Sequence, residues 1–588
     1  MKKQLKVIAV VLLAAVLCKG SLFPAAPAGE TGRKHGLAPV NPDFSIYIKN
    51  IEKGIEPSFS TNGYKQGYIP PPVDMSHVKG VIDERANQSY PSYYNLRDLG
   101  RVTRVKDQGS YPACWIFAAY ASLESCLLPE EVDFSEWHLA NNHGFDYGIQ
   151  DAGNSWMTTA YLIRWSGPVE EWLVPYPSIA APLFDLNRIF STYPVSKHVQ
   201  QVIFLPEREN PLDNNTIKYF LTEYGPVDFA MNWVFNNFDS NHNSQYTPNN
   251  RNQNHRLAIV GWDDDYPASN FRYRPPGSGA FIARNSWGVN WAEGGYCYIS
   301  YYDLSLQEFT CFNNAEHVTN YESIYQYDPL GRTSSWGDRD SWGANVFTAF
   351  DNRALDAVGF YTNDSNVQYN IYIYKSLNET DIANNPRNGS PAAEKTGNFT
   401  YPGFYTVRLD DPVPLETGER FSVVIRFVNS INPYSVPLEI PILRHSSAAW
   451  ANPGESYVSR DGMEWEDLTE LVPDSNVCIK AYTEFPGARI TLQAERVTLR
   501  AWIIRRDYGE ISFTIENLDE VPVSTIVLLR RSMGGEFEEL VHISPDELSN
   551  GRYSYSDRYL ERTGRYTYQV VAYNSGGLVT GRSNAETI

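Results

Sequence analysis

The sequence predicts a multidomain protein in which an α+β domain is followed by two all-β sandwich domains. Its 588 residues and 66.7 kDa exceed what one ordinary hydrophobic core organises. Residues 89 to about 317 mix helical and strand patterns. From about 318 onward, helical periodicity fades and short alternating apolar runs take over. These observations indicate about three units that fold independently.

The first 28 residues have the pattern of a secretory signal. Lys2, Lys3 and Lys6 precede an apolar run from Val7 to Leu17, and cleavage is expected near Ala28. A lipidated Cys18 is the alternative. The residue before a lipidated cysteine is normally small, whereas Leu17 is large. The sequence therefore predicts an exported protein, secreted or held at the cell surface, with no transmembrane segment.

Charge and composition narrow the classes of partner. A formal net charge of −20 repels phosphate backbones and anionic lipid, so no nucleic-acid partner is expected. The 40 Tyr and 14 Trp residues are typical of strand-rich modules that interact through their surfaces. Peptide, protein or glycan partners fit this composition better.

Residues 29–88 form a polar leader that is interrupted by turn-forming residues. It ends near Tyr68-Ile69-Pro70-Pro71-Pro72, which is expected to be extended. The leader lacks the periodicity of a hydrophobic core, so the first folded domain is predicted to begin near residue 89.

The α+β domain, 89–317, is predicted from two kinds of pattern. Apolar residues recur at helical spacing directly after Cys114, and buried strands are expected at 257–262, 280–283 and 296–302. Alternating runs at 367–373, 404–409 and 421–427 predict a β-sandwich over 318–485. A second sandwich is predicted over 486–588.

Cysteine usage singles out one thiol. The chain has six cysteines, of which Cys18 lies in the signal, so an odd number remains after export. Cys114 opens the predicted helix, where the helix dipole lowers a thiol pKa and favours the nucleophilic thiolate. The alternative for an isolated cysteine in an apolar setting is plain core packing.

Two later residues complete a catalytic pattern. His255 stands at the mouth of a strand 141 residues after Cys114 (255 − 114), inside the window of roughly 130 to 150 residues typical of a thiol nucleophile and its histidine. Asn285 follows one strand later, where its side-chain amide can accept the imidazole N–H and fix the ring. A histidine at the edge of an apolar run is by itself more often structural, but the order and spacing of the three residues predict a Cys-His-Asn triad.

Residues 89–317 resemble the papain-like cysteine peptidases. The resemblance rests on Gln108-Gly109-Ser110 ahead of Cys114-Trp115, on His255 before Val260-Gly261-Trp262, and on Asn285-Ser286-Trp287-Gly288. It implies that Gln108 and the backbone N–H of Cys114 form an oxyanion hole. It also implies a mature N-terminus within 91–98, so that 29–88 is a prosegment or a strap over the cleft.

The resemblance also implies a substrate pocket, in which this chain departs from the family pattern. The cysteine usually found three residues before the nucleophile is Tyr111, and both ends of one familiar disulfide are absent together. Arg256 is expected to project toward the pocket for the second substrate side chain. The residues that we place around the pocket are Pro112, Ala152, Gly153, Asn154, Arg256 and Trp287.

Other features have simpler interpretations. Asp263-Asp264-Asp265 lacks the spacing of a calcium loop and is predicted to be a solvated turn. Cys297 and Cys311 could pair across neighbouring strands, although the number of cysteines in the chain cannot decide whether they do. Trp336 and Trp342 could stack on sugars, but core packing is the simpler expectation. No metal or cofactor is expected.

The C-terminal half shows two weaker resemblances. Residues 318–485 are similar to the lectin-like β-sandwich of exported prokaryotic peptidases, through motifs at 325–331, 344–347 and 369–374. The last block resembles a fibronectin type III domain, because Leu560 followed by Tyr566 fits a tyrosine corner. A glycan or cell-surface ligand for the lectin-like part is a hypothesis that fold alone does not establish.

The resemblance implies a secreted cysteine endopeptidase with accessory binding domains, acting through a thioester acyl-enzyme. The rival hypothesis is a surface adhesin whose papain-like domain is an inactive scaffold. A cell-wall peptide hydrolase or transpeptidase would use the same thiol chemistry with another acceptor.

Overall fold

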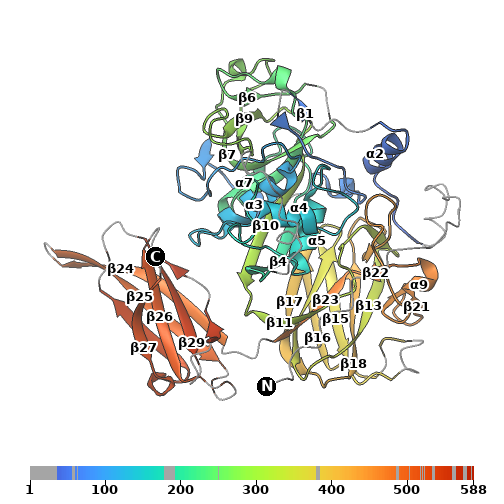
Figure 1. Ribbon diagram of the computed structural model, residues 1–588, viewed down its shortest axis with the longest axis vertical. Helices are drawn as coiled ribbons and strands as arrows, with labels where there is room; N and C mark the ends of the chain where they lie inside the picture. The colour runs from blue at the N-terminus through green and yellow to red at the C-terminus, as the bar shows by residue number, and fades with distance from the viewer. Residues whose placement is uncertain are drawn as a thin grey trace.

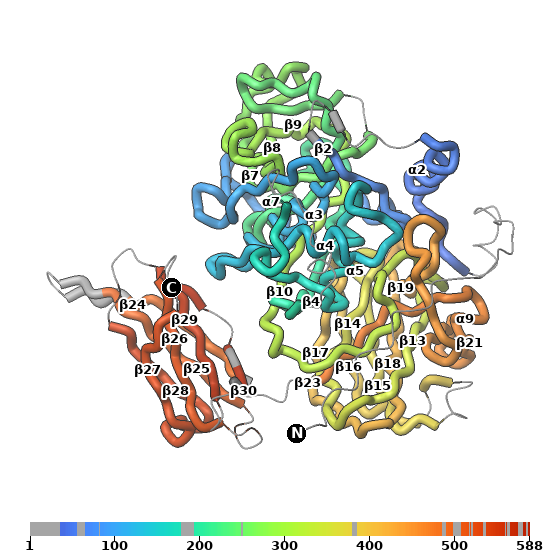
Figure 2. Tube along the Cα trace, in the orientation of Figure 1, coloured from blue at the N-terminus to red at the C-terminus, as the bar shows by residue number. Residues whose placement is uncertain are grey.

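The computed structural model (Figures 1 and 2) describes residues 36–588 apart from short gaps. The predicted signal (1–28) and residues 29–35 of the leader lie outside the described residues. The gaps are 56–59, 62–63, 82, 178–192, 249–250, 379–384, 388, 485–488, 502–503, 517, 519–520, 522, 533–536, 559, 561–564, 574–578 and 584–585. The expected order, an α+β part followed by mostly β domains, is confirmed.

The α+β domain places a helical half against a strand half. Its helices are α3 (Cys114–Cys126), α4 (Glu136–Asn142), α5 (Ser155–Ile163) and α7 (Asn215–Glu223), with 3₁₀ turns η3 (Phe235–Asn237) and η4 (Ala268–Asn270). Its strands are β3 (Tyr93–Asn95), β4 (Lys197–Phe204), β5 (Val227–Met231), β6 (Ser244–Gln245), β7 (His255–Asp263), β8 (Ala280–Arg284), β9 (Tyr296–Ser300) and β10 (Gln307–His317). The expected helix after Cys114 and the strands after 255, 280 and 296 are confirmed.

Two hydrophobic cores lie on the two sides of this domain. One surrounds α3 and includes Trp115, Tyr120 and Met157, while the other lies against the sheet and includes Leu257 and Trp287. Helix α3 is buried over nearly its whole length, which explains its weakly amphipathic sequence. Cys114 begins α3 and His255 begins β7, and the backbone N–H of Arg256, the residue after His255, lies within hydrogen-bonding reach of the Cys114 sulfur.

The boundary predicted near 318 is crossed by a continuous sheet. Twelve of the described strands form it, in the order β11-β23-β14-β17-β4-β10-β5-β7-β8-β9-β6, with β3 paired to β7. The junction is the antiparallel ladder between β4 and β17, in which Ile203 faces Gly403 and Val202 faces Phe404. Hydrogen bonds therefore join the first two domains through their backbones as well as through side chains.

The middle domain, 318–485, is a sandwich as expected. A six-stranded sheet, β16-β15-β18-β13-β20-β21, packs on the outer strands of the shared sheet around a core that includes Phe360, Ile371 and Ile425. Its first strands are β11 (Tyr321–Tyr325), β12 (Ser334–Trp336), β13 (Asp340–Thr348), β14 (Ala354–Thr362), β15 (Val367–Tyr374), β16 (Ala393–Phe399) and β17 (Gly403–Pro414). They are followed by β18 (Arg420–Val428), β19 (Val436–Glu439), β20 (Ser456–Ser459), β21 (Glu466–Asp467), α9 (Leu468–Leu471), β22 (Asn476–Val477) and β23 (Ile479–Glu484).

The suggested pairing of Cys297 with Cys311 is wrong. Cys297 lies on β9 and Cys311 on β10, but β5, β7 and β8 stand between these strands in the sheet. These two strands follow one another in sequence but are not neighbours in the sheet. Both thiols are free and buried, as are Cys114 and Cys478, while Cys126 is half-buried and free.

Residues 36–88 form a segment that we call the strap. It contains α2 (Pro42–Glu52), short strands β1 (Ser60–Thr61) and β2 (Tyr64–Lys65), and 3₁₀ turns η1 (Ser76–Val78) and η2 (Glu84–Ala86). Asn41 caps α2 by accepting the N–H of Asp43, and Pro42 follows at the first helical position. Figure 1 shows α2 beside the helices of the first domain and near the top of the middle sandwich.

The C-terminal domain, from β24 onward, is a second sandwich. One sheet orders its strands β24-β25-β28, and the other β27-β26-β29-β30 with β31 on β29. Its elements are β24 (Arg489–Ala501), β25 (Ile504–Glu516), β26 (Thr525–Ser532), β27 (Glu538–Ile543), η5 (Pro545–Glu547), β28 (Arg552–Asp557), β29 (Tyr566–Tyr573), β30 (Val579–Arg582) and β31 (Glu586–Thr587). The sandwich is confirmed, while its fibronectin type III character stays a prediction. In the described part of the chain, no helix has the length and apolarity needed to span a bilayer.

Candidate active site

Cys114 lies where the sequence predicts, at the first residue of α3. It is fully buried, and Ala113 at the N-cap has no side-chain oxygen to bind the first helical N–H groups. The N-terminal end of α3 therefore keeps its partial positive charge for the sulfur. The position suits a thiol that must become negative during a reaction.

His255 and Asn285 are brought together as predicted. His255 Nε2 lies 2.9 Å from Asn285 Oδ1, which also accepts the backbone N–H of Ser286 at 2.8 Å. Because the Ser286 N–H identifies this atom as the amide oxygen, His255 Nε2 must carry the proton and donate it. Within the described structure, Nδ1 has no hydrogen-bond partner. The imidazole is thus held in the tautomer whose Nδ1 is a base.

Aromatic side chains shield this pair. Trp287 stacks on the His255 ring, with centroids 4.7 Å apart and planes at 18°. Trp233 meets Trp287 edge-on at 5.1 Å, and Trp291 does the same from another side. Trp287 thus covers the His255–Asn285 hydrogen bond with a bulky ring that excludes water.

Gln108 is oriented by a partner that the sequence analysis missed. The hydroxyl of Ser286 donates to Gln108 Oε1 at 2.6 Å, and the Gln108 backbone N–H donates to Ser286 O. The amide group therefore turns its Nε2 outward, where it donates to Tyr111 O at 2.8 Å and to Lys65 O at 3.3 Å. This donor is available for a carbonyl oxygen, which is what an oxyanion hole requires.

The strap fills the cleft next to these residues. The carbonyl of Lys65 accepts from Gln108 Nε2 and from Trp287 Nε1, both at 3.3 Å. The Gln66 side chain donates to Trp233 O at 3.1 Å. A side chain at position 67 would stand 2.0 Å from Pro112 O, so only glycine fits. The strap thus occupies the part of the cleft that a substrate backbone would need.

The predicted pocket residues 152–154 bind the next part of the strap. Ile69 N–H donates to Gly153 O at 3.0 Å, and Gly153 N–H donates to Gly67 O at 3.4 Å. Asn154 donates from Nδ2 to Ile69 O at 3.1 Å while its Oδ1 caps α5. Ala152 is buried beside them, and a Cβ at Gly153 would lie 2.5 Å from the Trp115 ring. Only glycine therefore fits at position 153 while the strap backbone lies this close.

Arg256 lies behind the pocket, where two carboxylates bind it. Its guanidinium donates to both oxygens of Asp228 at 3.0 Å and to Glu308 Oε2 at 2.9 Å, and it is fully buried. Glu308 Oε1 in turn accepts the hydroxyl of Tyr68, 2.5 Å away. Tyr68 is the strap residue beside Gly153, so its side chain contacts Glu308 and not Arg256.

Two of these functional side chains had no usable sequence signal. Asp228 and Glu308 come from separate strands, and only the fold brings them to Arg256. Glu308 also has a φ of 51°, at an irregularity in the pairing of β10 with β5. A positive φ in a non-glycine residue is strained and is concentrated at functional sites. Ser286, by contrast, stands in the quoted Asn285-Ser286-Trp287 motif and could have been found there.

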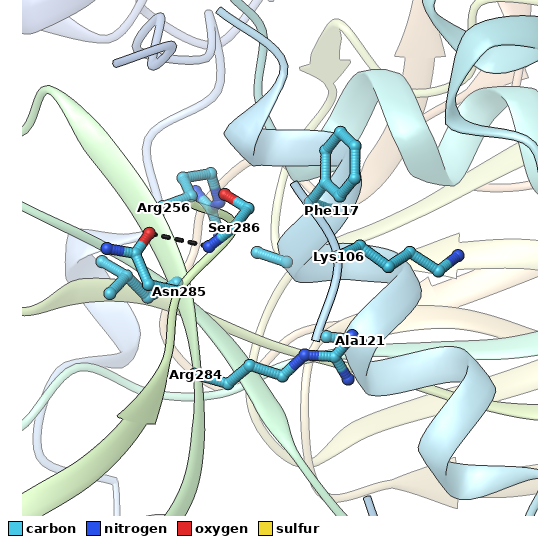
Figure 3. A pocket seen from close by; sticks show the side chains of 9 residues that line it. Lys106, Phe117, Ala121, Arg256, Arg284, Asn285 and Ser286 are labelled. Atoms are coloured by element: carbon cyan, nitrogen blue, oxygen red, sulfur yellow. Dashed lines mark hydrogen bonds between the residues drawn. The ribbon is translucent and has the colours of Figure 1, made fainter. Parts of the chain in front are cut away.

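A small cavity lies between the Asn285-Ser286 segment and α3. It is lined by Phe117, Arg256, Arg284, Asn285 and Ser286 among others, and its volume is about 10 Å³. Figure 3 shows Asn285 and Ser286 on one side of it, with their hydrogen bond dashed, and Phe117 and Lys106 toward α3. This volume suits about one water molecule, so the cavity is no substrate pocket.

Burial favours the neutral forms of Cys114 and His255. It raises the pKa of the Cys114 thiol to about 12, although the backbone N–H and charge of Arg256 and the backbone N–H of Gly67 oppose it. It lowers the pKa of His255 to about 4, with the Asn285 hydrogen bond acting in the opposite direction. Near pH 7 burial therefore favours the thiol form of Cys114 and the neutral imidazole of His255.

The remaining sequence features have structural roles. Asp264 binds Lys218 Nζ at 2.7 Å and accepts the hydroxyl of Tyr301, so it belongs to a network of local contacts. Trp336 and Trp342 are buried, which confirms their expected core packing.

Comparison with protein families assigns the class. Residues 90–314 match the papain family cysteine protease model, and residues 324–483 match the lectin-like domain model. The chain therefore contains a papain-family C1 peptidase domain followed by a lectin-like domain. From here, 89–317 is called the peptidase domain and 318–485 the lectin-like domain.

The same two-domain arrangement occurs in a solved structure. The cysteine protease and lectin-like domains of Cwp84, a surface layer associated protein of Clostridium difficile, align with a TM-score of 0.63 and 25% identity, over 76% of this chain and 98% of that one. Clostridial Cwp84 after propeptide cleavage aligns with a TM-score of 0.59 and 26% identity, over 67% and 100%.

Curated relatives match a smaller share of this chain. A cysteine protease of Blomia tropicalis is 28% identical over 238 residues, which are 38% of this chain and 66% of the relative. Ananain of Ananas comosus is 27% identical over 221 residues, 37% and 57% of the two lengths. The chain thus spans less than two thirds of the length of these relatives.

Proposed function

We propose that this protein is an exported cysteine endopeptidase, made as a latent precursor whose strap must leave the cleft before substrate enters. The observation that carries the proposal is the hydrogen bond from His255 Nε2 to Asn285, which leaves Nδ1 as a base beside the helix that begins at Cys114. Gln108 Nε2 supplies the remaining requirement, a donor for a carbonyl oxygen.

The chemistry follows from these roles. Cys114 gives its proton to His255 Nδ1, and the sulfur attacks the carbonyl carbon of the substrate. The oxygen becomes an oxyanion and accepts from Gln108 Nε2 and the backbone N–H of Cys114. When the C–N bond breaks, His255 returns the proton to the leaving amine and a thioester remains. Water, deprotonated by His255, then attacks the thioester and restores the thiol.

The same roles give the direction of a substrate in the cleft. His255 must protonate the leaving amine, so the C-terminal part of a substrate lies on the side of Trp287, and the acyl part lies on the side of Gly153. The strap runs the opposite way, because Lys65 is at Trp287 and Ile69 is at Gly153. A reversed chain presents no carbonyl in the reactive orientation, which explains how the strap fills the cleft without being cut there.

The lectin-like domain also holds the strap in place. Ala38 N–H donates to Ser335 O of the lectin-like domain at 2.8 Å, and His77 Nε2 binds Asn363 O at 2.8 Å. The stretch 87–89 is exposed, whereas β3, beginning at Tyr93, pairs with β7. We therefore place maturation in the exposed stretch, with a mature N-terminus near Ser89 to Ser92. Mass spectrometry of the processed protein measures it directly, and an intact strap on a fully active enzyme would contradict this proposal.

The pocket beside Gly153 is expected to prefer tyrosine. In a strap-free enzyme, a tyrosine hydroxyl entering as Tyr68 does would reach Glu308, and a hydrogen bond to a charged group contributes about 1.5–3 kcal/mol. We expect kcat/KM for a peptide with Tyr at this position to exceed that of its Phe counterpart by roughly tenfold. Paired fluorogenic peptides measure the ratio.

A matched pair of variants tests the cause of this preference. Glu308→Gln keeps the shape but removes the charge, so the Tyr/Phe ratio should fall to about threefold because charge-assisted hydrogen bonds are roughly twice as strong as neutral ones. Glu316→Gln, on the same strand, should leave the ratio unchanged. Equal cleavage of Tyr and Phe peptides by the unmodified enzyme would remove Glu308 from the pocket.

Casein cleavage by the strap-free protein tests the proposed activity, with Cys114→Ala as the comparison. The unmodified enzyme should cleave, and the variant should lose at least about 10³-fold in rate. Equal background cleavage by both proteins would favour the alternative of a surface adhesin with an inactive scaffold. Amide products joined to an added amine acceptor would instead indicate a transpeptidase.

Export and a cell-surface location complete the proposal. They are supported by the pattern of residues 1–28 and by the likeness to Cwp84, which is described as surface layer associated. A glycan or cell-surface ligand of the lectin-like domain stays a prediction, which a glycan array would test. Buried Trp336 and Trp342 are not its binding platform.

A further inference from the structure

Helix α2 of the strap docks on the junction between the peptidase and lectin-like domains. Phe44 is the buried residue of this helix, with 2% of its surface exposed. Its ring meets the His445 ring of the lectin-like domain edge-on, with centroids 5.1 Å apart and planes at 75°. The helix is therefore anchored by one aromatic side chain.

The surface under Phe44 is built by both domains. His445 contacts the peptidase rings of Phe145 and Tyr147, with centroids 5.0 and 5.6 Å away. His445 Nδ1 and the Tyr147 hydroxyl lie 3.1 Å apart, and His445 O accepts the N–H of Asp146 at 3.0 Å. We call Phe145, Tyr147 and His445 the His445 site. Burial lowers the pKa of His445 to about 3, so its ring is uncharged at neutral pH and suits an aromatic partner.

The His445 site is continuous with the catalytic cleft. Asn41, the cap of α2, donates from its backbone to Pro72 O at 2.9 Å and from its side chain to Pro71 O at 3.0 Å. Those prolines follow directly on Tyr68 and Ile69, which bind the Gly153 loop. A chain that leaves the cleft past Gly153 therefore arrives beside the start of α2, three residues from Phe44.

We propose that, once the strap is removed, the His445 site binds an aromatic side chain of the protein substrate, so that the lectin-like domain takes part in substrate selection. This inference rests on the proposed peptidase function. Because the acyl part of a substrate lies on the Gly153 side, the aromatic residue belongs N-terminal to the scissile bond. The strap spans this path with three residues from Ile69 to Pro72 and three more from Asn41 to Phe44, which places the aromatic residue roughly six to nine residues from the scissile bond.

Paired peptide substrates test this directly on the strap-free full chain. The first is a short peptide that fills only the catalytic cleft. The second peptide carries a ten-residue N-terminal extension with one Phe, which is placed in turn at each position from six to nine residues before the scissile bond. The third peptide carries the same ten residues at its C-terminus. We expect the N-terminal extension to raise kcat/KM about tenfold through a lower KM, and the C-terminal extension to have no such effect. Exchanging the Phe of the extension for Ala should remove the gain.

Variants of the enzyme assign the gain to the site. His445→Ala should abolish it while leaving cleavage of the short peptide unchanged, and His445→Phe, which keeps an aromatic face, should restore most of it. Met463→Ala, at an exposed position of the lectin-like domain, is the matched control. Even if His445→Ala disturbs the junction between the two domains, exchanging Phe for Ala in the peptide still tests the site, because the enzyme is then unchanged.

The outcomes separate this inference from the function on which it rests. An equal gain from both extensions, or a gain that His445→Ala leaves intact, would overturn the distal site while the peptidase function stands. Failure of the unmodified enzyme to cleave the short peptide would overturn both.

Discussion

Replacing Gln108 by alanine in the strap-free protein is expected to lower kcat for peptide hydrolysis by roughly 10² to 10³-fold and to leave KM within about threefold. The Gln108 amide is held by Ser286 so that Nε2 points into the cleft, where it now binds Lys65 O. A fixed donor of this kind stabilises the charge that develops on the carbonyl oxygen, and it contributes little to the neutral ground state.

Steady-state kinetics on a short fluorogenic peptide measures this effect. Gln368→Ala, at an exposed position of β15, controls for the exchange itself and should behave as the unmodified enzyme does. A Gln108→Ala enzyme with normal kcat would show that another group stabilises the oxyanion. A rise in KM alone would assign Gln108 to substrate binding.

Replacing Gly67 by valine is expected to release the strap and to activate the unprocessed protein. A Cβ at this position would lie 2.0 Å from Pro112 O, which is backbone and cannot rotate away. Overpacking of this kind typically costs about 1–3 kcal/mol, which corresponds to a strap bound roughly 5- to 150-fold less tightly. The initial rate of peptide cleavage before any processing should rise by a factor in that range.

The control for this experiment is Gly54→Ala at the end of α2. A side chain there meets open space, so only the cost of its φ of +71° is added and no clash with the peptidase domain arises. Gly54→Ala should remain latent. An unprocessed Gly67→Val protein that is as inactive as its parent, with an unchanged melting temperature, would show that the strap does not block the cleft.

Much of the catalytic geometry could be predicted because it is encoded locally. Cys114 opens a continuous apolar helix, His255 begins one buried strand and Asn285 directly follows another. The spacing of these residues along the chain is then enough to predict the site, since the fold brings them together. Asn41 and Pro42 also carry a local helix-start signal, yet the polar composition of 29–88 favoured an extended leader over α2.

The rest depends on pairings between distant parts of the chain. Nothing in the sequence of β4 says that it pairs with β17 some two hundred residues later, so the predicted boundary near 318 cuts a continuous sheet. The distance between Cys297 and Cys311 likewise depends on sheet order. Arg256 gives no local hint that Asp228 and Glu308 bind it, and its expected place in the pocket is taken by Glu308.

Labelling by a thiol-directed epoxide peptide inhibitor at pH 7, before and after proteolysis within the exposed stretch 87–89, tests the central claim most directly. Under the strap, burial holds the Cys114 pKa near 12, so thiolate is scarce and the inhibitor finds the cleft filled. We predict one adduct, on Cys114, that appears only after the strap has left. No adduct in either form, equal labelling of both forms, or an adduct on another cysteine would contradict a latent cysteine peptidase.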